Sequence, residues 1–133
     1  MTHFQQVITV FVPVSAQDAA LDFYVNTLGF EQRVDFAYAD GERWVEVAPP
    51  GAVTQITLAR SREGRPAGVE TGIVLQASDV EAAHREFAAA GVDVDAAILG
   101  EGEEPIVWAG AVQAGRPPMF RLRDRDGNSF LVT

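Results

Sequence analysis

The residues that decide the fold are Val7–Phe30, which read VITVFVPVSAQDAALDFYVNTLGF. The first part, VITVFVPV, is rich in β-branched and aromatic residues and predicts a strand over residues 7–14. Ser15 then offers a hydroxyl to the first free amides of a helix, with Asp18 three residues later as in a capping box. Gly29 is expected to end the helix, because glycine adopts the left-handed conformation after a helix at little cost. The apolar residues of this helix recur at helical spacing and predict one face packed on a sheet: Ala16, Ala20, Leu21, Tyr24 and Leu28.

The rest of the chain completes this pattern and then repeats it. Three further strands are predicted over residues 31–39, 42–47 and 53–59, with the hairpin signal Asp40-Gly41 between the first two. After a linker, a strand is predicted over residues 71–77. A helix follows, which begins at Ser78 with Glu81 in a capping box and ends at Gly91. Strands over residues 92–98, 119–123 and 129–132 complete the repeat, with a long connection over residues 100–118.

This order predicts an α+β fold made of two tandem βαβββ modules, which is most simply explained by an internal duplication. The first module is expected over about residues 5–60, the linker over about residues 61–69 and the second module over about residues 70–133. A chain of 133 residues with 47% hydrophobic residues can form a single compact domain of this kind.

Composition excludes several classes of protein. The net charge of −9 argues against binding to nucleic acid or to an anionic membrane, since both require a positive field. No apolar run approaches the roughly 20 residues that span a bilayer, and no signal peptide is recognisable. The chain has no cysteine, which excludes a disulfide framework, thiolate metal ligands and a cysteine nucleophile. We therefore expect a cytoplasmic protein with no nucleic-acid or membrane partner.

The alternation within the predicted strands separates an apolar face from a mixed face. The apolar face is expected to lie under the helices as the core: Ile8, Val10, Val12, Val45, Val47, Ile56, Leu58, Ile73, Leu75, Phe130 and Val132. The other face combines small residues, hydrogen-bonding groups and large aromatic side chains: Thr9, Phe11, Trp44, Glu46, Gln55, Thr57, Gly72, Val74, Gln76, Ser129 and Leu131. Such a mixture is typical of the wall of a ligand cavity. The alternative is a face that packs against its counterpart or a partner subunit without any ligand.

A set of short motifs, in order along nearly the whole chain, resembles one family. The motifs are Val14–Tyr24, Leu28-Gly29-Phe30, Arg43-Trp44-Val45, Ser78-Asp79-Val80, Ala90-Gly91-Val92 and Phe120–Asn128. In these the chain resembles the vicinal-oxygen-chelate superfamily, also called the glyoxalase / bleomycin resistance protein / dioxygenase superfamily. The resemblance implies curved mixed sheets around a shared cavity, and a homodimer, which is usual for single-chain members of this length.

The resemblance also locates four strand positions at which the metal enzymes of the family carry His, Glu or Gln ligands. In this sequence the positions fall on Thr9, Thr57, Gly72 and Leu131. Glycine and leucine have no donor side chain, and a threonine hydroxyl is a weak neutral donor. The chain therefore looks like the metal-free branch, which includes drug-binding resistance proteins, and no metal or cofactor is expected.

The leading interpretation is a metal-independent small-molecule-binding protein of the bleomycin-resistance type, which sequesters a drug or a metabolite. The residues expected to line the ligand site are Thr9, Phe11, Trp44, Glu46, Gln55, Thr57, Trp108, Arg121 and Leu131. Trp108 either folds over the cavity mouth or merely anchors the long connection.

Two other interpretations stay open. The first is an enzyme: either a metal-independent lyase, isomerase or hydrolase that uses Glu46 as its base, or a lyase, isomerase or dioxygenase-like metal enzyme with relocated ligands. A carboxylate beside an aromatic wall can have its proton affinity raised, although Glu46 could equally form a salt bridge with Arg121 or be exposed. The second is a structural or regulatory dimer with a filled cavity.

Overall fold

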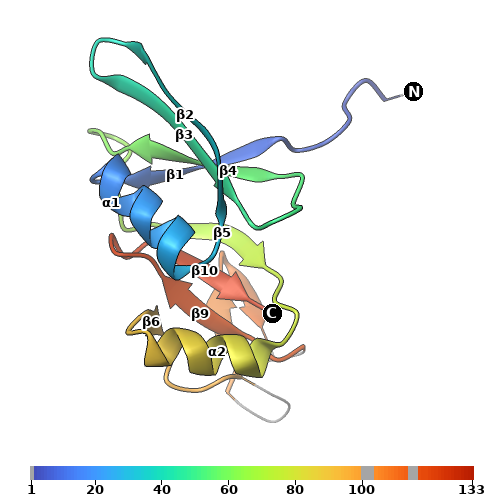
Figure 1. The fold of residues 1–133 in the computed structure, drawn as a ribbon. Coiled ribbons are helices and arrows are strands. Elements are labelled where there is room, and N and C mark those ends of the chain that lie inside the picture. Colours follow the sequence, from blue (N-terminus) through green and yellow to red (C-terminus); the bar gives the residue numbers. More distant parts are fainter. Residues whose placement is uncertain (1, 100–103, 114–116) are drawn as a thin grey trace. The chain divides into compact units, whose positions relative to one another are not determined.

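The protein is described by a computed structural model, which places residues 2–99, 104–113 and 117–133. These residues form an α+β fold with curved mixed sheets (Figure 1), so the fold class predicted from the sequence is confirmed. The chain divides into two compact units, Met1–Ala67 and Gly68–Thr133, which are described separately. None of the described helices has the length and apolar character needed to cross a bilayer.

The first unit follows the βαβββ order. Its elements are β1 (Thr9–Val14), α1 (Gln17–Asp22), the π-helical turn η1 (Phe23–Thr27), β2 (Glu31–Ala39), β3 (Glu42–Ala48) and β4 (Gln55–Arg60). The strands lie in the order β1-β4-β3-β2, with β1 parallel to β4 and the other pairs antiparallel. The hairpin of β2 and β3 curves away from the rest of the unit (Figure 1).

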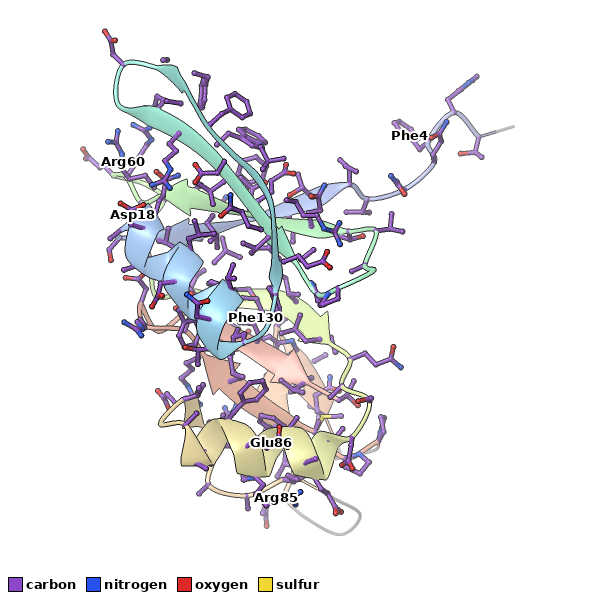
Figure 2. The ribbon with its side chains drawn as sticks, viewed as in Figure 1. Phe4, Asp18, Arg60, Arg85, Glu86 and Phe130 are labelled. Atoms are coloured by element: carbon purple, nitrogen blue, oxygen red, sulfur yellow. The ribbon has the colours of Figure 1, made fainter. Side chains whose placement is uncertain are left out.

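Helix α1 covers the apolar face of this sheet. The side-chain amide of Gln17 donates to the carbonyl oxygens of Arg43 (2.8 Å) and Leu58 (2.9 Å), and Asp18, which Figure 2 labels on α1, pairs with Arg43 at 2.5 Å. Beneath the helix, Val45, Val47 and Leu58 are fully buried. The strand phase predicted for β3 is therefore confirmed.

The start of the first unit differs from the prediction. The first strand begins at Thr9 instead of Val7, so Ile8 is 53% exposed and does not belong to the core. The N-cap position of α1 is occupied by Ala16, one residue after the predicted Ser15, and Ala16 has no side-chain oxygen that could cap the helix.

After α1 the chain continues as the π-helical turn η1, which has one more residue per turn than an α-helix. The amide of Leu28 donates to the carbonyl oxygen of Phe23 at 3.0 Å, five residues back, which defines a π turn. The inserted residue rotates the buried face, so Phe23 packs in the core beside the predicted Tyr24. Gly29 follows at φ +81°, as predicted for the residue that ends a helix.

The second unit repeats the order and adds a hairpin. Its elements are β5 (Glu70–Leu75), α2 (Val80–Ala89), β6 (Asp93–Val94), β7 (Ile106–Trp108), β8 (Ala111–Gln113), β9 (Phe120–Arg123) and β10 (Ser129–Val132). The main sheet has the order β5-β10-β9-β6, and β7 and β8 form a separate two-stranded sheet. The sequence predicted neither this hairpin nor the shortness of β6, which was expected over residues 92–98.

Helix α2 covers the apolar face of the second sheet. Its first turn is capped by Asp79, whose carboxylate accepts the amide of Ala82 at 2.9 Å, so the predicted cap at Ser78 is wrong by one residue. On the covered face, the ring of His84 packs edge-on against Phe120 at 5.0 Å. Phe130, labelled in Figure 2, and Val132 are buried as predicted.

Candidate functional site

Four aromatic side chains form a continuous series on the mixed face of the first unit, and we call them the aromatic strip: Phe11, Trp44, Tyr38 and Phe36. Ring centroids lie 5.5 Å apart between Phe11 and Trp44, 6.4 Å between Trp44 and Tyr38, and 6.1 Å between Tyr38 and Phe36. Phe11, Phe36 and Tyr38 are 46%, 53% and 56% exposed. Several large apolar side chains left exposed together mark a binding surface more often than a passive one.

A small polar group lies directly beside the strip. Thr57 pairs in register with Phe11 on one side and with Glu46 on the other. Both Glu46 and Thr57 are buried. The indole nitrogen of Trp44 donates to a carboxylate oxygen of Glu46 at 2.8 Å, and the hydroxyls of Thr9 and Thr57 are 2.7 Å apart. These contacts fix the Trp44 ring and the Glu46 carboxylate relative to each other.

The carboxylate of Glu46 can accept further hydrogen bonds in this arrangement. Among the described residues of the first unit, the one hydrogen-bond partner of its side chain is Trp44, and Glu46 takes part in no ion pair within this unit. The alternative partner considered from the sequence, Arg121, pairs instead with Asp95 at 2.9 Å. A carboxylate that is held by one neutral donor can accept a further hydrogen bond or balance a cation.

The predicted site residues fall into two groups. Thr9, Phe11, Trp44, Glu46 and Thr57 lie together in the first unit, with Gln55 opposite Thr9 at the start of β4. The other three lie in the second unit, where Trp108 packs on Leu131 and Arg121 is opposite Leu131 in the sheet.

Sequence reasoning missed Phe36 and Tyr38. A regular two-residue hairpin at Asp40-Gly41 would place Ala37 opposite Trp44. An irregularity between Ala37 and Ala39 shifts the register and places Phe36 there instead. The alternation along β2 indicates that Phe36 and Tyr38 share a face, but it does not indicate that this face carries Trp44.

In the second unit, Trp108 fills the mixed face. It is 3% exposed and forms a buried cluster with Met119 and Leu131, which Leu99 and Ile106 border. Within this unit the Trp108 ring covers Leu131, a position that fits the interpretation of Trp108 as the anchor of the long connection.

Arg121 is held by a charge network in the same unit. Its guanidinium and backbone amide both donate to one oxygen of Asp95 (2.9 and 3.0 Å), and Arg123 donates to the other oxygen at 3.0 Å. Burial alone would raise the pKa of Asp95, but the hydrogen bonds from Arg121 and Arg123 outweigh it and hold the pKa below its usual range.

The four positions of the family's metal ligands do not fit a divalent ion. Thr9 and Thr57 bond to each other, Gly72 has no side chain, and Leu131 lies in an apolar cluster. In the part of the chain that the structure describes, no three His, Asp or Glu side chains gather as a metal site would require.

Comparison with known proteins identifies the family. The family model described as "Glyoxalase/Bleomycin resistance protein/Dioxygenase superfamily" matches residues 3–132. The chain belongs to this superfamily. The resemblance drawn from the motifs is thereby confirmed.

Individual relatives of this superfamily protein cover nearly its whole length. TnmS3 from Streptomyces sp. CB03234, described as an antibiotic binding protein, is 30% identical with a TM-score of 0.77 and covers 100% of this chain and 98% of its own. A superfamily member from Sphaerobacter thermophilus DSM 20745 is 33% identical with a TM-score of 0.78 and covers 98% of each chain. YetH of Bacillus subtilis (strain 168) is 28% identical over 129 residues, which are 96% of this chain and 97% of YetH.

Proposed function

We propose that this protein binds a small planar or apolar molecule on the aromatic strip, without a metal, and so sequesters a drug or a metabolite. The observation that carries the proposal is the strip itself, in which exposed rings from β1 and β2 flank a tryptophan of β3 that is fixed by a buried carboxylate. Stacking on such rings buries a large apolar area at little conformational cost. The description of the similar TnmS3 as an antibiotic binding protein supports the same kind of ligand.

The charge of the site favours a ligand that carries a hydrogen-bond donor or a positive charge. Glu46 can accept from the ligand while Trp44 holds its other side. The net charge of −9 adds a general attraction for cations.

Calorimetric titration with two probes of similar size tests this function: 9-aminoacridine, a planar cation, and anthracene-9-carboxylate, a planar anion. We expect the cation to bind more tightly, and Trp44→Ala to weaken its binding by about 1–3 kcal/mol, as for a buried aromatic anchor. Phe4→Ala is the matched control, because Phe4 is an aromatic residue outside the strip and is 89% exposed. The proposal fails if neither probe binds, or if Trp44→Ala binds as the wild type does.

A second candidate function is a metal-independent enzyme that uses Glu46 as a base, and the burial of this carboxylate beside the strip favours it. Glu46→Gln distinguishes the two. For a binding protein, the variant changes only the affinity or the preference for charge. For an enzyme, turnover falls by about a hundredfold or more while binding persists.

The absence of a metal is part of the proposal. Because Thr9, Thr57, Gly72 and Leu131 offer no suitable donors, the purified protein is expected to hold no stoichiometric divalent ion. Elemental analysis that finds about one zinc, nickel, iron or manganese per chain would overturn this part.

We also infer a homodimer in the cytoplasm. Exposed apolar side chains outside the aromatic strip, such as Val7, Ile8 and Val53, would be buried by a second copy of the chain. The lack of cysteine suits a reducing compartment. Light scattering at micromolar concentration should give twice the chain mass, and cell fractionation should place the protein in the cytoplasm; a monomer mass would count against the dimer.

A further inference from the structure

The hairpin β7–β8 is joined to its own unit by few interactions. It forms a separate two-stranded sheet, and in the described residues neither strand pairs with the four-stranded sheet. Its outer side chains Val107 and Val112 are 60% and 70% exposed. The hairpin is therefore attached to the second unit mainly by contacts that its inward-facing side makes.

Three contacts hold the inner side, and one of them is Ile106, which packs against the cluster of Trp108, Met119 and Leu131. The ring of Trp108 packs on Met119 and Leu131, and a carboxylate oxygen of Glu70 accepts the amide of Ala109 at 2.5 Å. Burial of an indole ring is strongly favourable, and a charged acceptor makes a stronger hydrogen bond than a neutral one. These interactions keep the hairpin closed over the sheet.

Two other features work against closure. Ala109 has φ +49° in the tight turn, where Gly110 follows at +82°, and a non-glycine residue is strained in this left-handed region. The indole nitrogen of Trp108 is buried without a hydrogen-bond partner among the described residues, although water would satisfy it in an open state. The closed hairpin thus carries both backbone strain and an unsatisfied donor.

We propose that the β7–β8 hairpin is a displaceable cover whose Trp108 ring occupies the place of a ligand ring in the second unit. When the cover opens, Leu131, Met119 and Leu99 form an apolar floor that accepts an aromatic or apolar ring. The inference rests on the proposed small-molecule binding. It deepens that function, because the second unit then takes part only after the cover has moved. Ligands that supply a hydrogen-bond acceptor to the freed indole are favoured.

The first test measures opening without any ligand, by amide hydrogen exchange of residues 106–113. Glu70→Gln weakens the charged hydrogen bond and is expected to speed exchange of the hairpin by about fivefold or more. Ala109→Asn creates an Asn-Gly turn that tolerates positive φ at both positions and is expected to slow it by about fivefold. Glu63→Gln, an exposed carboxylate in the first unit, is the control for loss of one charge and should leave the hairpin unchanged.

The second test measures the floor with the dye 8-anilinonaphthalene-1-sulfonate, which fluoresces on apolar surfaces. Relative to the wild type, Glu70→Gln should increase the bound fluorescence at least about twofold and Ala109→Asn should decrease it, because the aromatic strip contributes equally to all three proteins.

The proposal is overturned if the two variants do not shift exchange in opposite directions, if the hairpin exchanges only with the rest of its unit, or if the dye signal is the same in all proteins. None of these outcomes depends on Trp44. A negative result would therefore overturn the proposed opening of the hairpin without overturning ligand binding on the aromatic strip.

Discussion

The two tryptophans of the chain occupy opposite situations in two units of the same order. Trp44 lies in an exposed aromatic series and donates to a carboxylate, whereas Trp108 is buried on leucine and methionine, and its nitrogen has no partner in the described part of the chain. Thus the mixed sheet face of the first unit leaves aromatic rings exposed, whereas on the mixed face of the second unit Leu131 is covered by Trp108 of the same unit.

The registers of the two sheets show how this difference arises. Thr57 is flanked in register by Phe11 and Glu46, and Leu131 is flanked in the same way by Val74 and Arg121. The open face therefore has a carboxylate where the covered face has an arginine that is already paired with Asp95. In the first unit the strand after the helix, β2, is long and pairs with β3. In the second unit the corresponding strand, β6, has two residues, and the chain then forms the extra hairpin β7–β8. A repeated scaffold can thus keep one face free for a ligand while the other stabilises the fold.

The largest effect is expected at the covered tryptophan. Trp108→Ala should lower the free energy of unfolding by about 3–5 kcal/mol, because it removes a buried ring and leaves a void over Leu131 and Met119. Trp44→Ala should lower it by less than half as much, since Trp44 is only partly buried. Urea denaturation measures both, and equal losses would remove the distinction between the two faces.

The second effect compares the two faces of the first unit. Leu58→Ala should destabilise by about 2–5 kcal/mol, because Leu58 is fully buried under α1. Under conditions in which the Leu58→Ala variant remains folded, it should bind 9-aminoacridine as tightly as the wild type does. A loss of binding greater than that of Trp44→Ala in folded protein would contradict the assignment of the strip as the site.

A smaller effect is expected from the charge network of the second unit. Asp95→Asn should lower the free energy of unfolding by about 1–3 kcal/mol at neutral pH, since it weakens hydrogen bonds from Arg121 and Arg123. The pKa of Asp95 is lowered in the folded protein, so its contribution is complete above the unfolded value near 3.8 and is lost as pH falls through the folded pKa. Denaturation curves at several pH values should show that Asp95→Asn and wild type converge in acid; a constant difference down to pH 2 would refute this role.

Much of this architecture was predictable from local sequence. Alternation in β3 assigned Val45 and Val47 to the core and Trp44 and Glu46 to the opposite face, and glycines marked the ends of both helices. These features can be predicted from the sequence because each depends on a single residue type or on the alternation of side chains along a strand.

The errors have a common physical origin in non-local or irregular structure. The π turn at Phe23, the register shift that brings Phe36 opposite Trp44, and the hairpin around Ala109 each insert or rearrange backbone in a way that periodicity does not encode. The covering of Leu131 by Trp108 was likewise hidden, because the Ala-Gly turn lacks the usual Asn or Asp signal.

The most direct test of the central claim, that the open face of the first unit binds the ligand, is nuclear magnetic resonance of the two indole N–H groups in nitrogen-15-labelled protein. The two signals are assigned with Trp44→Phe, and 9-aminoacridine is then added. The account predicts that the Trp44 signal moves in step with saturation measured by calorimetry, because stacking on the ring and contact with Glu46 both change the environment of this proton. A Trp44 signal that stays in place while the protein becomes saturated would contradict the account.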